Sequence, residues 1–258
     1  MEISLVVPTY NDGPKALQSV VTLKAYLDHL GVSYEILLVD DGSLPKLRPD
    51  ASQLPSGAQL VQILKNKGKG HAVKRGMMAA QGSCRMFLDA DLPFHLDCIG
   101  RAWQNFQNYG CAMIVGDRSH PGSTQDGDRP WERQLMSHVL FRLNRVLLLI
   151  SCRDTQCGFK AFSADFAKDV FPKIRSHGFT FDIELFLFAY RNGYDVYHVP
   201  VSALPQEGSK VRTVLDSLGS LSSLIEIYRN RNSYHLGKLA APHMREGHDV
   251  DCETPQAG

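Results

Sequence analysis

The sequence lacks any long hydrophobic run. Its most apolar later stretch, Val146–Ile150, is five residues long, whereas a helix needs roughly 20 apolar residues to cross a bilayer. The strand-like residues Ile3–Val7 follow Met1 and Glu2 directly, without the basic start and the apolar stretch of a signal peptide. We therefore expect no transmembrane helix and a cytoplasmic location.

Metal-binding cysteine spacing and an excess of one charge are also missing. The six cysteines show no C-x-x-C pattern, so neither a zinc site nor a disulfide framework is predicted. The 28 basic and 27 acidic residues leave a net charge of +1, so no overall field attracts nucleic acid and any anion must bind locally. With 258 residues and 43% hydrophobic content, we expect one domain over residues 1–235, followed by a disordered tail over residues 236–258.

Two carboxylates one residue apart follow an apolar strand-like stretch. Met86–Leu88 leads directly into Asp89 and Asp91. Strand side chains alternate between faces, so both carboxylates would emerge on the same side. Such a pair repels, and a hard divalent cation with phosphate oxygens relieves the repulsion. An ordinary turn at a strand end uses the same spacing, so this pattern alone leaves both interpretations open.

Strands and helices alternate through the first half of the chain, which is typical of an α/β fold with a mostly parallel central sheet. Ligands bind beyond the carboxyl ends of such strands, so Pro8–Asn11, Asp40–Ser43 and Asp89 should face one crevice. A plain turn is the alternative for Asp40–Ser43. The expected strands are residues 3–7, 34–39, 59–64, 84–88 and 112–116.

A glycine-rich basic turn, Lys65–Ala72, follows the third expected strand and opens a helix. Free backbone N–H groups at a helix N-terminus, together with lysines, suit a phosphate. The turn is not a Walker loop, because the G-x-x-x-x-G-K-[ST] spacing is absent, and no G-x-G-x-x-G follows the first strand. A solvated lysine-rich loop remains the alternative.

The second half of the chain is more polar and more irregular. Residues 117–130 suggest a mobile active-site loop, with Arg118 opening it. The amphipathic helix expected over residues 131–151 favours core packing over membrane contact. Acidic residues stabilise helix N-termini, which is a good explanation for the carboxylates of Asp182 and Glu184. The other expected elements are a helix from about 95 to 109, a polar turn at 153–160, a helix beginning within 179–185, a strand at 195–199, a basic loop at 207–212 and a helix at about 214–228.

The ordered motifs resemble those of the family 2 inverting glycosyltransferases. Within that family they look like the polyprenyl-phosphate sugar synthases, nearest to the dolichyl-phosphate glucosyltransferases and next to the dolichyl-phosphate mannose synthases. The resemblance implies a single GT-A-type domain for nucleotide-diphospho-sugar transfer, with a mostly parallel central sheet flanked by helices. The motifs are Val7–Asn11, Val39–Ser43, Asn66–Ala72, Asp89–Asp91, Asp154–Lys160, Phe181–Glu184 and Gly208–Val211.

The same resemblance implies roles for individual residues. Asp89 and Asp91 would hold Mg²⁺ or Mn²⁺, and Asp154 matches a position proposed as the base. A phosphate acceptor is already largely ionised near neutral pH, so positioning can matter more than proton removal. Nucleotide-sugar contacts are implied for Pro8, Thr9, Tyr10, Asp41, Lys69 and Asp89, catalytic roles for Asp154, Asp91, Arg118 and Arg133, and acceptor or phosphate contacts for Ser137, Asp182 and Lys210.

The resemblance predicts inverting transfer of a hexose, with a UDP-glucose-like donor favoured, to a polyprenyl or dolichyl monophosphate. A soluble transferase with a small acceptor, a GDP-mannose-dependent synthase and a non-catalytic nucleotide-sugar-binding subunit remain alternatives. Two features depart from the family pattern. Pro93 stands where mannose synthases carry a further metal ligand, and the transmembrane helices of membrane-bound members are missing. A peripheral contact at the cytoplasmic face of a membrane, or a membrane partner protein, would compensate for the second.

Overall fold

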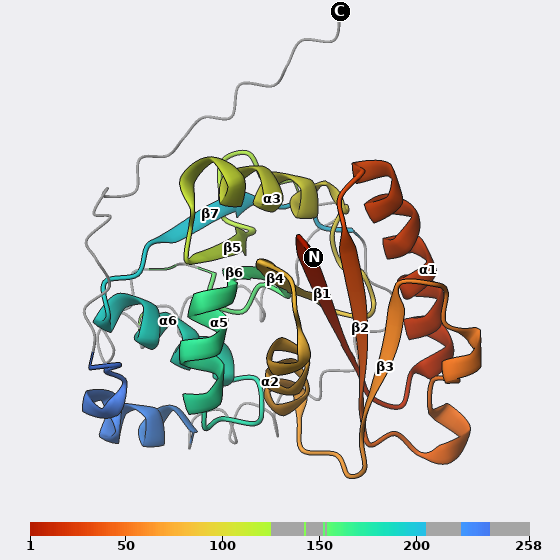
Figure 1. The fold of residues 1–258 in the computed structure, drawn as a ribbon. Coiled ribbons are helices and arrows are strands. Elements are labelled where there is room, and N and C mark those ends of the chain that lie inside the picture. Colours follow the sequence, from red (N-terminus) through yellow and green to blue (C-terminus); the bar gives the residue numbers. More distant parts are fainter. Residues whose placement is uncertain (125–141, 143–151, 153, 205–222, 238–258) are drawn as a thin grey trace, which may run out of the picture.

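A single mixed sheet organises the molecule (Figure 1). The structure, a computed structural model, describes residues 1–124, 142, 152, 154–204 and 223–237. Within these residues the sheet has seven strands in the order β3-β2-β1-β4-β6-β5-β7. The strands are β1 Ile3–Thr9, β2 Tyr34–Asp41, β3 Ala58–Ile63, β4 Cys84–Leu88, β5 Met113–Asp117, β6 Phe159–Ser163 and β7 Val196–Pro200.

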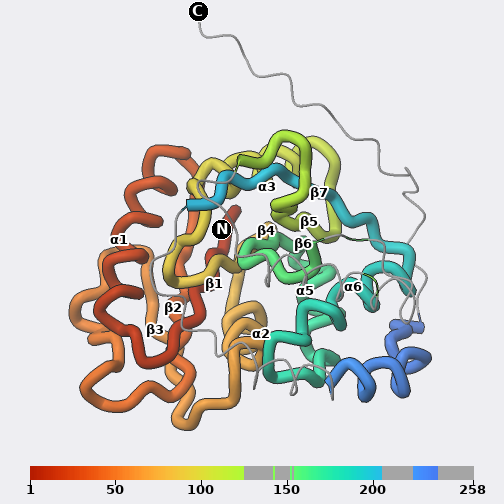
Figure 2. Tube along the Cα trace, turned by 180° about the vertical axis from the view of Figure 1, so that it is seen from behind, coloured from red at the N-terminus to blue at the C-terminus, as the bar shows by residue number. Residues whose placement is uncertain are grey.

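Helices cover both faces of this sheet. In Figures 1 and 2, α2, α5 and α6 gather on one side, whereas α1 and α3 lie on the other. The helices are α1 Gly13–Leu30, α2 Lys69–Ala79, α3 Asp97–Tyr109, α5 Ala164–Val170 and α6 Phe181–Arg191. Short 3₁₀ turns occupy Pro45–Leu47, Ala51–Gln53, Phe171–Lys173 and Arg231–Ser233.

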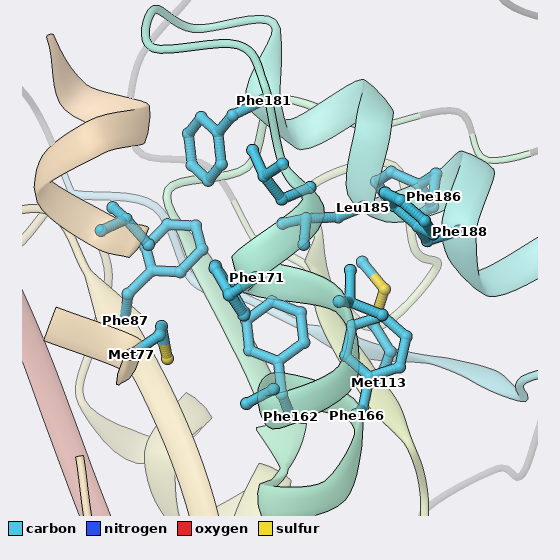
Figure 3. Close-up of a cluster of buried hydrophobic side chains, with 14 of the residues drawn as sticks. Met77, Phe87, Met113, Phe162, Phe166, Phe171, Phe181, Leu185, Phe186 and Phe188 are labelled. Carbon is cyan, nitrogen blue, oxygen red and sulfur yellow. The ribbon is translucent and has the colours of Figure 1, made fainter. Parts of the chain in front are cut away.

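Side-chain alternation along the strands builds one core on each face. In β1, Leu5 and Val7 join the core under α1 and α3, whereas Val6 joins the core under α2, α5 and α6. The second core is rich in aromatic rings (Figure 3). Phe87 lies 5.8 Å from Phe181 between ring centroids, which ties β4 to the start of α6. The sheet is therefore buried on both faces, as its near-continuous apolar strands predict.

The expected order of the first half is confirmed, with small shifts at the ends of elements. The first helix ends at Gly31, as the sequence predicts. Gly31 adopts φ +69°, and its N–H donates a hydrogen bond to the Asp28 carbonyl, as in a glycine C-cap. β2 extends two residues further than expected, through Asp40 and Asp41, because both residues still pair with β3. The helix expected from about residue 95 begins at Asp97.

The second half contains a strand that the sequence pattern did not reveal. Residues 159–163, expected only as the end of a polar turn, form β6, which lies antiparallel between β4 and β5. Five residues carry too little periodicity to distinguish a strand from a loop. The helix α5 that follows was missed for the same reason. Of the helix expected over 214–228, residues 223–229 are described as helical, whereas the helix expected over 131–151 and the tail lie almost entirely outside the described residues.

Candidate active site

Asp89 lies beside the turn that precedes β6. Because β6 runs antiparallel to β4, Leu88 at the end of one strand pairs with Phe159 at the start of the other. The Asp89 N–H donates to the Gly158 carbonyl over 3.2 Å. β1 and β2 run parallel to β4, so their carboxyl ends reach the same edge of the sheet. The structure thus brings the Asp-x-Asp motif and the Asp154–Gly158 turn together at one rim.

Lys69 forms an ion pair with the first carboxylate of the motif. Its Nζ lies 2.6 Å from Asp89 Oδ1, with the two side chains 18% and 30% exposed. The same ammonium lies 5.8 Å from the ring centroids of Phe87 and Phe179. Burial lowers the pKa of Lys69, but the charges of Asp89 and Asp182 outweigh that effect and raise the pKa overall. Lys69 therefore stays cationic at the rim.

Asp91 lies in a turn and not on a strand. β4 ends at Leu88, so the alternation expected to align the two carboxylates does not act here. A turn places them instead, with the Leu92 N–H donating to the Asp89 carbonyl over 3.0 Å and Leu92 at a φ of +47°. Burial, and then the charge of Asp89, raise the pKa of Asp91. The two carboxylates therefore repel each other, as their spacing predicts.

The two carboxylates suit a divalent cation that arrives with a diphosphate. Mg²⁺ is often bound by one or two carboxylates plus substrate phosphates and water. Within the part of the chain that the structure describes, no cluster of three or more potential ligands is present. The raised pKa of Asp91 beside Asp89 marks a site that gains from positive charge. The donor set fits a metal, provided that phosphate and water complete its coordination.

The Asp41 carboxylate binds backbone N–H groups of the basic turn. Its carboxylate accepts hydrogen bonds from the Gly68 N–H over 2.7 Å and from the Lys67 N–H over 3.1 Å. The His71 N–H at the start of α2 donates to the His177 carbonyl over 3.2 Å. The prediction that free N–H groups of this turn await a phosphate is therefore wrong for these three donors. The side chains, among them exposed Lys67, remain available.

The end of β1 presents one exposed ring and one buried hydroxyl. Tyr10 is 50% exposed, and Thr9 is 6% exposed. The Thr9 hydroxyl has no hydrogen-bond partner among the described residues. Pro8 precedes them within β1 and pairs with Val39. The rim therefore offers an exposed aromatic ring at the end of β1, which is the kind of surface on which a base can stack.

Arg118 and Asp154 form a bidentate ion pair. The guanidinium donates from Nη2 to Asp154 Oδ1 over 2.6 Å and from Nε to Oδ2 over 2.7 Å. The Arg118 backbone N–H adds a third bond of 3.0 Å. Burial acts to raise the pKa of Asp154, but Arg118 outweighs it and lowers the pKa overall. A carboxylate held in this way is a weak base and a good anchor for the guanidinium.

Hydrogen bonds to a histidine and a serine anchor the residue before Arg118. Asp117 at the end of β5 lies 3.1 Å from His198 Nδ1 on β7. Asp117 also accepts hydrogen bonds from the backbone N–H of Ser119, over 2.8 Å, and from its hydroxyl. Burial acts to raise the pKa of Asp117, but these bonds lower it to about 2. The strand end that carries Arg118 is thus fixed on both sides.

Lys160 is the buried cation beneath the site. Its side chain is fully buried, and its Nζ contacts the carbonyls of Thr155 at 3.0 Å and Cys157 at 2.9 Å. Asp182 Oδ1, at the start of α6, lies 2.7 Å from the same nitrogen. Asp182 is only 2% exposed, so an interaction with the helix dipole does not by itself explain this residue. Lys160 ties the turn that carries Asp154 to α6.

Gly158 lets Asp89 approach the turn closely. A Cβ at this position would lie 2.3 Å from Asp89 Oδ2 and 2.8 Å from its Cγ. Sequence reasoning placed Gly158 and Lys160 in a motif without giving either a role. The signal was their spacing after Asp154, but their function depends on the antiparallel pairing of β6, which was not expected. Three of the predicted site residues, Arg133, Ser137 and Lys210, lie outside the described residues.

Among the residues that the structure describes, no helix is long and apolar enough to span a membrane.

A comparison with known protein families matches residues 4–171 to the model of glycosyl transferase family 2. The chain belongs to this family of glycosyltransferases. The match includes the rim from Thr9 to Gly158, so the carboxylates and basic residues described above lie within the family domain. It ends before α6, which carries Asp182.

Curated relatives extend the similarity over most of the family 2 chain. The dolichyl-phosphate beta-glucosyltransferase of Saccharomyces cerevisiae is 28% identical over 255 residues, covering 91% of this chain and 75% of the relative. The protein of the same name from Dictyostelium discoideum is 28% identical, with 91% and 75% covered. The human protein of that name is 26% identical, with 81% of this chain and 69% of the relative covered.

Solved structures share the fold at lower identity. Glucosyl-3-phosphoglycerate synthase from Mycobacterium tuberculosis, solved with Mn²⁺, UDP-glucose and phosphoglyceric acid, has a TM-score of 0.65 and 21% identity, with 92% of this chain and 80% of that chain covered. Mannosyl-3-phosphoglycerate synthase from Rubrobacter xylanophilus has a TM-score of 0.63 and 17% identity, with 90% and 75% covered. The GT-A-type fold expected from the motifs is confirmed.

Proposed function

We propose that this family 2 glycosyltransferase transfers glucose from UDP-glucose to dolichyl phosphate with inversion at the anomeric carbon. The observation that carries the proposal is the similarity to dolichyl-phosphate beta-glucosyltransferases over 91% of the chain. The rim supports it, because Asp89 of the carboxylate pair packs against Gly158, in the same turn as Asp154, which pairs with Arg118.

The donor half of the rim consists of Tyr10, Asp41, Lys69, Asp89 and Asp91. The exposed ring of Tyr10 suits a base, and the Lys69 ammonium suits a diphosphate. Asp89 and Asp91 would hold Mg²⁺ or Mn²⁺, and such an ion neutralises charge on the leaving nucleoside diphosphate. Solved neighbours that contain Mn²⁺ or Mg²⁺ with UDP support this use of a metal.

The acceptor half consists of Arg118 and Asp154, with Lys160 beneath them. Arg118 supplies a planar fork that suits a phosphate monoester. Asp154 occupies the Nε–Nη2 edge of the guanidinium through its two bonds of 2.6 and 2.7 Å, so in this proposal the phosphate binds at the Nη1 side. Since the acceptor phosphate is already largely ionised near neutral pH, its oxygen attacks without prior proton removal. Asp154 acts in this proposal by positioning Arg118, which agrees with its lowered pKa. The predicted acceptor contacts of Arg133, Ser137 and Lys210 stay part of the proposal.

A transfer assay with radiolabelled donors tests the proposal. We expect lipid-extractable product from UDP-glucose and dolichyl phosphate, and a large loss of product with Asp91→Ala at an unchanged melting temperature. If product forms from GDP-mannose instead, the proposed donor is wrong. If product forms on phosphoglyceric acid but not on dolichyl phosphate, the proposed acceptor is wrong. An absence of product with every pair, at full nucleotide binding, would favour a non-catalytic subunit.

Nucleotide preference is measured separately by thermal melting. A ligand that binds only the native state raises the melting temperature by mass action. We expect a shift with UDP that grows on adding Mn²⁺, and little shift with GDP. A larger shift with GDP would contradict the proposed donor even if the acceptor were right.

A further inference from the structure

Asp89 already has a cation on one of its two carboxylate oxygens. Lys69 Nζ lies 2.6 Å from Oδ1, which is the length of a strong charge-assisted hydrogen bond. The pair is only partly exposed, at 18% for Lys69 and 30% for Asp89. Water therefore screens the attraction less than at an open surface. A metal that uses Asp89 Oδ1 must compete with this ammonium.

The other oxygen of Asp89 packs closely against Gly158 on one side. Oδ2 would lie 2.3 Å from a Cβ on Gly158, so Gly158 leaves no more than a glycine's space beside it. The Asp89 N–H is fixed to the Gly158 carbonyl at 3.2 Å. The packing at Gly158 therefore limits how the Asp89 carboxylate can turn on one side, and Oδ1, where Lys69 binds, is where a metal competes with the ammonium.

Lys69 offsets about half of the negative charge of the carboxylate pair without a metal. Asp89 and Asp91 contribute two negative charges, and Lys69 offsets one of them at contact distance. Asp91 receives its nearest positive influence from Lys15 and from the same Lys69. A free divalent cation therefore meets a site of roughly one net negative charge, which attracts it more weakly than two bare carboxylates would.

The Lys69 ammonium has other favourable contacts within reach when a nucleotide binds. Its ammonium lies 5.8 Å from the rings of both Phe87 and Phe179, whose faces attract a cation. The Asp182 carboxylate also acts on it from below. A diphosphate on the rim offers the strongest alternative, because its charge exceeds that of one carboxylate.

We propose that Lys69 is the resident counter-cation of Asp89 and that the diphosphate of the donor draws it away, so that the metal binds with the nucleotide and weakly by itself. The proposal rests on the proposed function only for the identity of the nucleotide. Metal and nucleotide then strengthen each other's binding by the same factor, as linkage requires. In this exchange the positive charge of the arriving metal is offset by the negative charge of the arriving diphosphate.

Binding of Mn²⁺ without nucleotide tests the exchange directly. Free Mn²⁺ is measured by electron paramagnetic resonance in titrations of the wild type and of Lys69→Met. Removing the ammonium should tighten Mn²⁺ binding about tenfold, as expected when one charge at contact distance in a partly screened site is lost. UDP should strengthen Mn²⁺ binding to the wild type, and this enhancement should shrink in Lys69→Met.

Two further variants control for charge and for folding. Lys69→Arg retains a cation and should bind Mn²⁺ alone as weakly as the wild type. Lys67→Met removes an exposed lysine of the same turn and should leave Mn²⁺ binding unchanged. Lys69→Met protein that melts like the wild type and binds Mn²⁺ alone no tighter would overturn the proposal, as would equal tightening by Lys67→Met. The metal-only arm contains neither donor nor acceptor, so a failed dolichyl transfer would leave its result intact.

Discussion

The two halves of the rim are held in different ways. In the donor half, short polar contacts to the backbone do most of the holding, since Asp41 accepts the N–H groups of Lys67 and Gly68. In the acceptor half, charged side chains hold one another, as in the pair of Arg118 with Asp154. The donor half thus depends mainly on hydrogen bonds between side chains and backbone groups, with one ion pair between Lys69 and Asp89, and the acceptor half mainly on pairs of charged side chains.

This difference follows from the topology of the sheet. The donor half lies at the ends of parallel strands, where each loop immediately follows the strand that positions it. The acceptor half depends on β6, which enters antiparallel between β4 and β5. Its preceding turn is fixed by Lys160, whose buried ion-pair partner Asp182 lies on α6. Breaking a contact should therefore have a larger and less local effect in the acceptor half.

Loss of the buried cation should give the largest effect. Lys160→Met would leave the Asp182 carboxylate buried without its ion-pair partner, and removing one partner of a buried pair costs about 3–5 kcal/mol. We expect the free energy of unfolding, measured in urea, to fall by about that amount. Lys24→Met is the matched control, because Lys24 pairs with Asp28 on the exposed side of α1. Equal urea midpoints for the two variants would contradict a structural role for Lys160.

A methyl group at Gly158 should separate activity from stability. In Gly158→Ala the new Cβ would lie 2.3 Å from Asp89 Oδ2, so Asp89 must move relative to Lys69. A displacement of about 1 Å at a reacting centre can cost on the order of 100-fold in rate. We expect the transfer rate to fall by about 10–100-fold with a smaller change in melting temperature. Gly178→Ala is the control, since a Cβ there meets nothing within 4 Å, and equal rates for the two variants would refute the steric argument.

The same contrast explains what could be predicted from the sequence. Asp40, Asp41, Asp89 and Asp91 were placed at one rim because each follows a strongly apolar run, and parallel strands end at one edge. The turn that aligns Asp89 with Asp91 was not predicted. Its geometry depends on Leu92, whose backbone lies in the left-handed region. Leucine rarely adopts this conformation, so the sequence gives no signal for it.

The acceptor half was harder to predict, for physical reasons. Arg118 and Asp154 were both named as site residues, but their direct pairing depends on a strand of five residues that has no clear periodicity. Lys160 looks like an ordinary surface lysine in sequence, because lysine is rarely buried without a partner. Its partner Asp182 was assigned to the acceptor and the helix dipole, so the ion pair between them went unseen.

Acid should weaken the acceptor half through Asp117. The folded-state pKa of Asp117 is lowered from 3.8 to about 2, so its contribution to stability is present above about pH 4 and is lost as the pH falls towards 2. A shift of this size corresponds to about 2 kcal/mol. We expect Asp117→Asn to flatten this part of the acid dependence of the urea midpoint. An unchanged slope between pH 4 and pH 2 would show that His198 and Ser119 do not stabilise the charged form.

The smallest effect should come from the donor half, where one hydroxyl ties the Asp-x-Asp turn to α1. Ser19 Oγ donates to the Ala90 carbonyl over 2.6 Å, between the two carboxylates. Ser19→Ala should reduce stability by about 1 kcal/mol, the usual net value of one hydrogen bond, and weaken Mn²⁺ binding in the presence of UDP a few-fold. Thr22→Ala is matched, because its hydroxyl bonds only within α1, to the Gln18 carbonyl at 3.2 Å. If Mn²⁺ binding weakens equally in both variants, helix stability and not the turn controls the site. If only Ser19→Ala weakens it, the hydrogen bond from α1 to the Asp-x-Asp turn sets the geometry of the donor half.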